Sequence, residues 1–197
     1  MPLLTANSPI IANVWNGTPE VCSAYILAKP HGGYTDWDIA HVIIPAYYDQ
    51  ARAVGIDPVM AIAQMIHETG NMTSWWSQRP NRNPAGIGVT GRTSLTKPST
   101  GAWQWNGHKW EEGCAFYDWA AASIPAHLGR LCAYALPYGE GNDAQRLAIS
   151  KAALWRPIPL TIRGRARTWD GLNGLWAVPG TTYGQSIAAI AQAIVNS

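Results

Sequence analysis

The chain has 197 residues, enough for one domain with a sizeable core. Charged residues make up 13% of it and the formal net charge is +2, so no strong field that would attract nucleic acid is expected. No apolar run reaches the roughly 20 residues of a membrane span, and no basic segment with a small-residue cleavage site opens the sequence. We therefore expect a monomer with no membrane span and no nucleic-acid partner.

Residues 1–34 are rich in Pro, Gly and Asn and include a possible short helix at 21–27. They predict an N-terminal arm that lies on a domain formed by residues 35–197. The domain begins with a helix at Thr35, where Thr35 and Asp38 have the spacing of a capping-box variant. Pro45 falls within the apolar pattern of this helix, so it should kink the helix or delay its start.

The next helix is the most informative stretch of the chain. Asp57 is a good N-cap and Pro58 fits the first helical position, while Gly70 can adopt the left-handed conformation that ends a helix. The residues between are almost all apolar, which predicts a buried helix. Gln64 and Glu68 break that pattern and share one face, four residues apart. Glu68 can therefore have a structural role, in which it pairs with an arginine or caps a loop. Alternatively, it serves as a general acid whose pKa is raised by apolar surroundings.

Residues 71–101 have the composition of a loop, and a hairpin follows around Asn106-Gly107, a dipeptide that favours a two-residue type I′ turn. That turn would place Trp105 opposite His108 and Trp103 opposite Trp110. Eleven tryptophans accompany a single phenylalanine. We expect more than half of them in the core, with the others offering flat apolar faces to sugar rings.

The second half of the chain predicts three more helices. Asp118 can cap the first, which runs through Tyr134 with an early kink at Pro125. Asn142 or Asp143 opens the second. After an irregular stretch at 156–180, Thr182 and Gln185 have capping-box spacing for a last helix at 183–195.

Several other sites are excluded by the spacing of their residues. The five histidines show no zinc-ligand pattern, and neither a P-loop nor a dinucleotide fingerprint is present. No metal and no cofactor are therefore expected. The three cysteines are too few for a disulfide framework, although the sequence allows a single bridge between Cys114 and Cys132. Cys114 with His127 has no flanking signature of a nucleophile and base.

Three segments together resemble a known family. The helix sequence A-Q-M-I-H-E-T-G at 63–70 is followed by N-P-A-G-I-G at 83–88, and W-A at 176–177 precedes T-Y-G at 182–184 and Ile187. This order is similar to that of the glucosaminidase family of peptidoglycan hydrolases, relatives of lysozyme, and covers roughly residues 38–195. The resemblance implies a lysozyme-like α+β fold: a mainly helical domain around a buried helix, with a small β-hairpin lobe beside a substrate groove.

The resemblance also implies an activity. Glu68 would protonate the leaving oxygen of a β-1,4 bond in peptidoglycan or a related aminosugar polymer, as in an endo-β-N-acetylglucosaminidase. A second carboxylate is usual in glycosidases. Glu111 and Glu112 are the leading candidates, ahead of Asp118 and Asp170, and the acetamido oxygen of the substrate is the alternative nucleophile.

Further residues are candidates for binding the sugar. Tyr183 matches the closing tyrosine of the family and would bind the sugar or orient its acetamido group, unless it only packs under the cleft. Asn83 would offer its amide to the sugar or form an Asn-Pro turn. The remaining candidates for substrate contacts are Gln64, Trp75, Trp76, Trp103 and Trp105.

The sequence leaves two other functions open. One is a cell-wall-binding module without catalysis, and the other is a lytic transglycosylase, which also uses one glutamate but forms an anhydro sugar. For any of these functions, we expect the protein to act outside the cell or at its wall. A phage lysin is one kind of protein that would fit this expectation.

Overall fold

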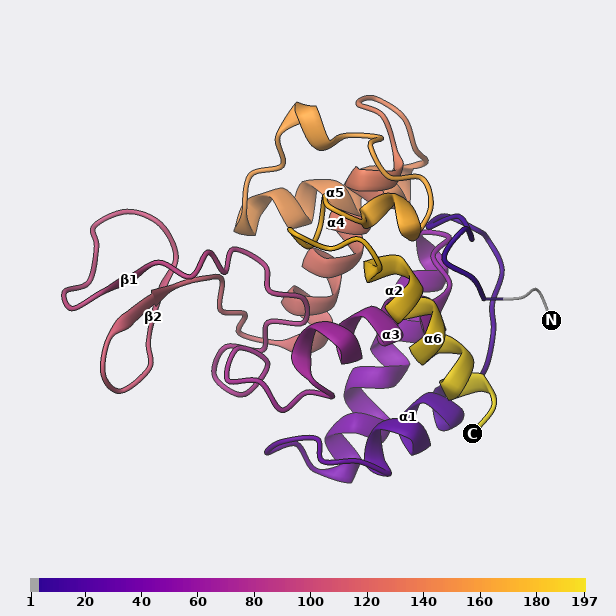
Figure 1. Cartoon of the computed structure of the whole chain (residues 1–197), viewed down its shortest axis with the longest axis horizontal. Coiled ribbons are helices and arrows are strands. Elements are labelled where there is room, and N and C mark those ends of the chain that lie inside the picture. The colour runs from indigo at the N-terminus through magenta and orange to yellow at the C-terminus, as the bar shows by residue number, and fades with distance from the viewer. Residues whose placement is uncertain (1–3) are drawn as a thin grey trace.

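The computed structural model describes residues 4–197 and shows a helical body with a small antiparallel sheet projecting from one side (Figure 1). This architecture confirms the predicted mainly helical α+β fold with a small β lobe. Within the described residues, no helix combines the length and the apolar character that crossing a bilayer demands. The α-helices are α1 (Pro19–Leu27), α2 (Ile44–Ala53), α3 (Pro58–Thr69), α4 (Ile124–Ala135), α5 (Asp143–Trp155) and α6 (Tyr183–Val195), and the strands are β1 (Thr93–Ser94), β2 (Trp103–Trp105) and β3 (Trp110–Glu112).

Helix α3 lies at the centre of the helical body, as its apolar sequence predicted (Figure 1). Asp57 caps it, because one carboxylate oxygen accepts from the backbone N–H groups of Val59 and Met60 at 2.9 and 3.4 Å. Gly70 ends it in the left-handed conformation, at a φ of 57°. Helices α1, α2 and α6 pack around α3, so both of its predicted ends and its burial are confirmed.

Prolines near the start of α2 and of α4 are accommodated by π-helical segments. Asp38–Ile43 runs directly into α2 and Trp119–Ser123 runs directly into α4, which leaves each proline in the first α-helical turn. A proline inside a continuous helix has no N–H to donate, and its ring crowds the carbonyl four residues earlier. The π-helical turn before each proline changes the hydrogen-bonding pattern at that point. The predicted caps are present as well: the backbone N–H of Thr35 donates to Asp38 at 2.9 Å, and that of Ala121 donates to Asp118 at 2.7 Å.

The predicted cap of α6 is wrong, although the helix has the predicted bounds. The side chain of Thr182 makes no capping hydrogen bond. Asn173 takes that role from a preceding loop, since its side-chain oxygen accepts from the backbone N–H of Gly184 at 2.8 Å. The spacing of Thr182 and Gln185 could not reveal a cap supplied from nine or more positions away. By contrast, Asn142 and Gln145 form a complete capping box at α5.

The predicted hairpin exists, but its predicted register is wrong. Trp105 pairs with Trp110, and Trp103 pairs with Glu112. The loop therefore has four residues instead of two. The side-chain oxygen of Asn106 accepts from the backbone N–H groups of residues 108 and 109, at 2.9 Å each, which favours the longer loop. Strand β3 is central in the sheet, between β1 and β2.

The predicted N-terminal arm, residues 1–34, begins outside the described residues. From residue 4 on, it contributes to the core: Ile10, Cys22 and Ile26 are fully buried in the same apolar cluster as α3. The boundary at residue 34 stays a prediction. Cys22, Cys114 and Cys132 are all buried and free, so the possible bridge between the last two is not formed.

Close packing of α4 against α5 depends on a glycine. A Cβ added at Gly129 would lie 2.0 Å from the backbone oxygen of Ala148 in α5. Gly129→Ala should therefore destabilise the fold by about 1–3 kcal/mol or more, because the helices must separate to admit the methyl group. Urea unfolding would measure this loss. Gly33→Ala is the matched control, since its methyl group would meet only the flexible end of Gln78. Equal stability of the two variants would contradict the close packing.

Candidate active site

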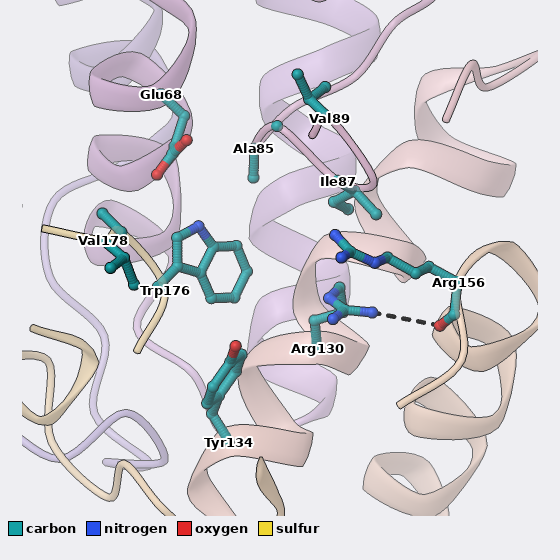
Figure 2. Close-up of a pocket in the computed structure, with 11 residues that line it drawn as sticks. Glu68, Ala85, Ile87, Val89, Arg130, Tyr134, Arg156, Trp176 and Val178 are labelled. Atoms are coloured by element: carbon teal, nitrogen blue, oxygen red, sulfur yellow. Dashed lines mark hydrogen bonds between the residues drawn. The ribbon is translucent and has the colours of Figure 1, made fainter. Parts of the chain in front are cut away.

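Glu68 lies one residue before the end of α3, half-buried, and lines a cavity of about 380 Å³ (Figure 2). The cavity is bounded by α3, by the loop that follows Asn83, by α4, and by the segment before α6. Glu68 therefore faces a concave site, as its position on an apolar helix predicted. The other lining residues are Ala85, Gly86, Ile87, Val89, Arg130, Tyr134, Arg156, Trp176, Ala177 and Val178.

A side chain from the C-terminal part of the chain holds the Glu68 carboxyl group. The hydroxyl of Tyr183 donates to Glu68 Oε1, and Trp176 lines the cavity beside the glutamate. Burial raises the pKa of Glu68, and the hydrogen bond from Tyr183 and the nearby indole of Trp176 oppose that shift without cancelling it. The carboxyl group thus keeps its proton to a higher pH than an exposed glutamate would.

A buried chain of hydrogen bonds continues behind Tyr183. The side-chain amide of Gln64 donates to the Tyr183 hydroxyl at 2.7 Å. The other end of that side chain, Gln64 Oε1, lies 2.8 Å from His127 Nε2, and His127 Nδ1 lies 3.0 Å from the Tyr47 hydroxyl. Burial lowers the pKa of His127 to about 3, so its ring is neutral and carries one proton.

The direction of each bond in this chain follows from its neighbours. Tyr183 uses its one proton on Glu68, so it accepts from the amide of Gln64. The amide oxygen of Gln64 must then accept from His127 Nε2, which leaves Nδ1 to accept from Tyr47. Every donor therefore points toward Glu68, from four different helices: α2, α3, α4 and α6.

Asn83 uses its side chain to shape the loop that lines the cavity. Its amide nitrogen donates to the backbone oxygens of Ile87 and Cys114 at 2.8 and 2.9 Å, and its amide oxygen accepts from the backbone N–H groups of Ala85 and Ile87. This loop brings Gly86 against the glutamate, where an added Cβ would lie 3.5 Å from Glu68 Oε2. A direct bond from Asn83 to a sugar stays a prediction, and it would require one of these bonds to open.

Glu111 and Glu112 lie on β3, and neither lines the cavity. Glu112 accepts from the Thr90 hydroxyl at 2.6 Å and pairs with Arg92 at 3.3 Å. Glu111 accepts from the side chain of Asn106 at 2.6 Å. The structure thus places both carboxylates in contacts within the β lobe, and does not bring them to Glu68.

The four candidate tryptophans also lie outside the cavity lining. Trp75 and Trp76 pack edge to face with ring centres 4.6 Å apart, Trp103 is buried, and Trp105 is 49% exposed. The prediction that most tryptophans are core residues is wrong, because three of the eleven are buried: Trp103, Trp119 and Trp169. The half-exposed ones retain faces that a sugar can reach.

Comparison with known proteins decides the family. The family model described as mannosyl-glycoprotein endo-beta-N-acetylglucosaminidase matches residues 44–196. The chain belongs to the glucosaminidase family. Among solved structures, the catalytic domain of the autolysin Auto from Listeria monocytogenes is similar, with a TM-score of 0.46 and 15% sequence identity over 91% of this chain and 89% of that one. A search of curated protein sequences found no match.

The match confirms the family resemblance of the sequence motifs, and this glucosaminidase is a glycoside hydrolase. Family membership implies peptidoglycan or a related aminosugar polymer as its substrate. Among residues 4–197, no cluster of three or more His, Cys, Asp or Glu side chains is arranged to hold a metal ion. The chemistry that the described site offers is that of a carboxyl group with an elevated pKa in a concave pocket.

Several residues of the glucosaminidase site were not predicted from the sequence. Trp176 was part of a motif but had no assigned role, and Arg130 and Arg156 had none either. His127 was considered only as a possible base for Cys114. Its position on the largely apolar helix α4, like that of Gln64 on α3, was the available signal, because a buried imidazole needs hydrogen-bond partners.

His127→Phe tests the hydrogen-bonded chain behind Glu68. The change fills the space but leaves Gln64 Oε1 and the Tyr47 hydroxyl without their partner, at about 1–3 kcal/mol for each group. Urea unfolding should show that loss. The Tyr183 proton is then held less firmly on Glu68, so the basic limb of the pH profile of kcat/KM should move to higher pH.

The control for this variant is Tyr47→Phe, which removes only the far end of the chain. It should cost less stability and shift the pH profile less. A His127→Phe enzyme that is stable enough to assay and keeps the wild-type pH profile would contradict a link between His127 and Glu68.

Proposed function

We propose that this glucosaminidase hydrolyses the β-1,4 bond between aminosugars of peptidoglycan, with Glu68 as the general acid that protonates the leaving oxygen. The observation that supports this role is the Glu68 carboxyl group in a cavity, with a pKa raised by burial. A general acid must be protonated near the working pH while remaining a good proton donor, and burial is the usual means of achieving both. The enzyme would act at the cell wall, where this polymer is found.

The described structure favours a mechanism in which the substrate supplies the second reacting group. Of the eleven residues that line the cavity, Glu68 alone is acidic. Asp118 caps a helix and Asp170 accepts from the hydroxyl of Thr168 at 2.6 Å, so both have local partners. We infer that the 2-acetamido oxygen attacks the anomeric carbon as the leaving oxygen takes the proton of Glu68. Water then opens the resulting ring, with Glu68 accepting its proton.

Tyr183 is a positioning residue in this proposal. Its hydroxyl proton is used on Glu68 and its oxygen accepts from Gln64. The bond to Glu68 stabilises the carboxylate that forms when the proton is transferred, so it favours the charged product of the acid step. Direct contact between Tyr183 and the acetamido group is not needed for this role.

Glu68→Gln removes the proton donor and keeps the shape of the side chain. General acid catalysis typically contributes ~10²–10⁴-fold, so release of reducing ends from purified cell walls should fall by at least about 10²-fold. Tyr183→Phe should cost less, because it removes one hydrogen bond and no reacting proton. Circular dichroism would show that both variants remain folded. Wild-type rates in Glu68→Gln would mean that another residue is the acid.

Glu111→Gln and Glu112→Gln, made separately, test for a second acid. A loss as large as that of Glu68→Gln in either variant would identify a partner carboxylate and would overturn the substrate-assisted route.

Mass spectrometry of the products separates hydrolysis from transglycosylation, since an anhydro sugar lacks the added water. Wall binding without turnover by the wild-type protein would instead favour a non-catalytic binding module.

A further inference from the structure

Two arginines face the glucosaminidase cavity at some distance from Glu68. Arg130 comes from α4 and Arg156 directly follows α5, and Figure 2 shows both guanidinium groups across the pocket from the glutamate, with Trp176 between. Arg130 is only 8% exposed. The acceptor that it does contact is uncharged: Nη1 donates to the backbone oxygen of Arg156 at 3.3 Å.

Among the described residues, neither guanidinium has a carboxylate partner. The ion pairs formed among residues 4–197 involve other side chains, and Glu68 instead accepts from Tyr183. Burial and the neighbouring charge of Arg156 lower the pKa of Arg130, because both disfavour its charged form. A buried charge without a counterion is unfavourable, so a ligand that supplies one gains affinity.

The geometry points to an anion subsite: we propose that Arg130 and Arg156 bind a carboxylate carried by the glycan substrate of this enzyme. The planar guanidinium presents N–H groups in a fork that matches the two oxygens of a carboxylate. This inference rests on the proposed function, because it assigns the far end of the same cavity. An anion subsite would discriminate between two classes of aminosugar polymer, because chitin is neutral whereas every second sugar of peptidoglycan carries a lactyl group.

That carboxylate has two possible sources in peptidoglycan. In strands stripped of peptide, the lactyl group itself ends in a free carboxylate. In native strands that group is amide-linked to a peptide, which carries carboxylates of its own. Both sources offer the same chemistry to the arginines, and the substrates of the test separate them.

The test measures kcat/KM on three substrates: a chito-oligosaccharide, peptide-free glycan strands and peptide-bearing glycan strands. For wild type, at least one acidic substrate should be preferred over the neutral one. Arg156→Gln should reduce that preference about tenfold or more, mainly through KM, because a charge-assisted hydrogen bond is lost. Arg165→Gln is the matched control, since this exposed arginine does not line the cavity. The acidic substrate that loses most identifies the source of the carboxylate.

Arg130→Gln is the second variant, and thermal unfolding would verify its fold because the side chain is buried. It should weaken the same preference as Arg156→Gln. Equal losses on neutral and acidic substrates in both variants would overturn the anion subsite while leaving the hydrolase intact. A wild-type enzyme that does not prefer either acidic substrate over the chito-oligosaccharide would also overturn the anion subsite. Failure of the wild type to cleave any of the three substrates would instead overturn the proposed function.

Discussion

The buried chain of hydrogen bonds from Tyr47 to Glu68 is the constraint on which the rest of the site depends. It crosses α2, α3, α4 and α6, and joins residues as far apart in the sequence as Gln64 and Tyr183. In a low-dielectric interior each of these polar groups is costly without its partner. A break in the chain would therefore destabilise the packing of the four helices, and the last donor of the intact chain ends on the carboxyl group of Glu68.

Two opposing effects set the acidity of that carboxyl group. Burial favours the protonated form, whereas the hydrogen bond from Tyr183 and the nearby indole of Trp176 favour the carboxylate. The net effect is a raised pKa, and the group that loses the proton already has a donor in place, the Tyr183 hydroxyl, to stabilise the resulting charge. Arg130 and Arg156 lie across the same cavity (Figure 2). The two sides of the pocket therefore differ in charge, with the acidic group on one side and two cations on the other.

The parts of the site that follow from local sequence rules were predictable. Asp57, Gly70 and the i, i+4 spacing of Gln64 and Glu68 define α3 and its polar face without any tertiary information. Tyr183 was predicted through a family motif. The partnership of His127 with Gln64 joins residues 63 positions apart, and no periodicity within a single helix encodes such a contact.

The errors have the same physical origin. The cap of α6 comes from Asn173 instead of Thr182, and Asn106 closes a longer hairpin loop than its Asn-Gly dipeptide suggests. In each case, the structure forms a hydrogen bond that the spacing of the residues did not predict, in place of the bond that the spacing favoured. The β lobe therefore has the predicted strands but keeps Glu111 and Glu112 among partners of its own.

Glu68 should hold its proton to a higher pH than an ordinary glutamate. Carbon-13 NMR titration of the glutamate side-chain carboxyls measures this directly, with the Glu68 resonance assigned by its absence in Glu68→Gln. We expect a midpoint above the usual glutamate value of about 4.3. A midpoint at or below that value would show that hydrogen bonding outweighs burial, and it would contradict the assignment of Glu68 as the general acid.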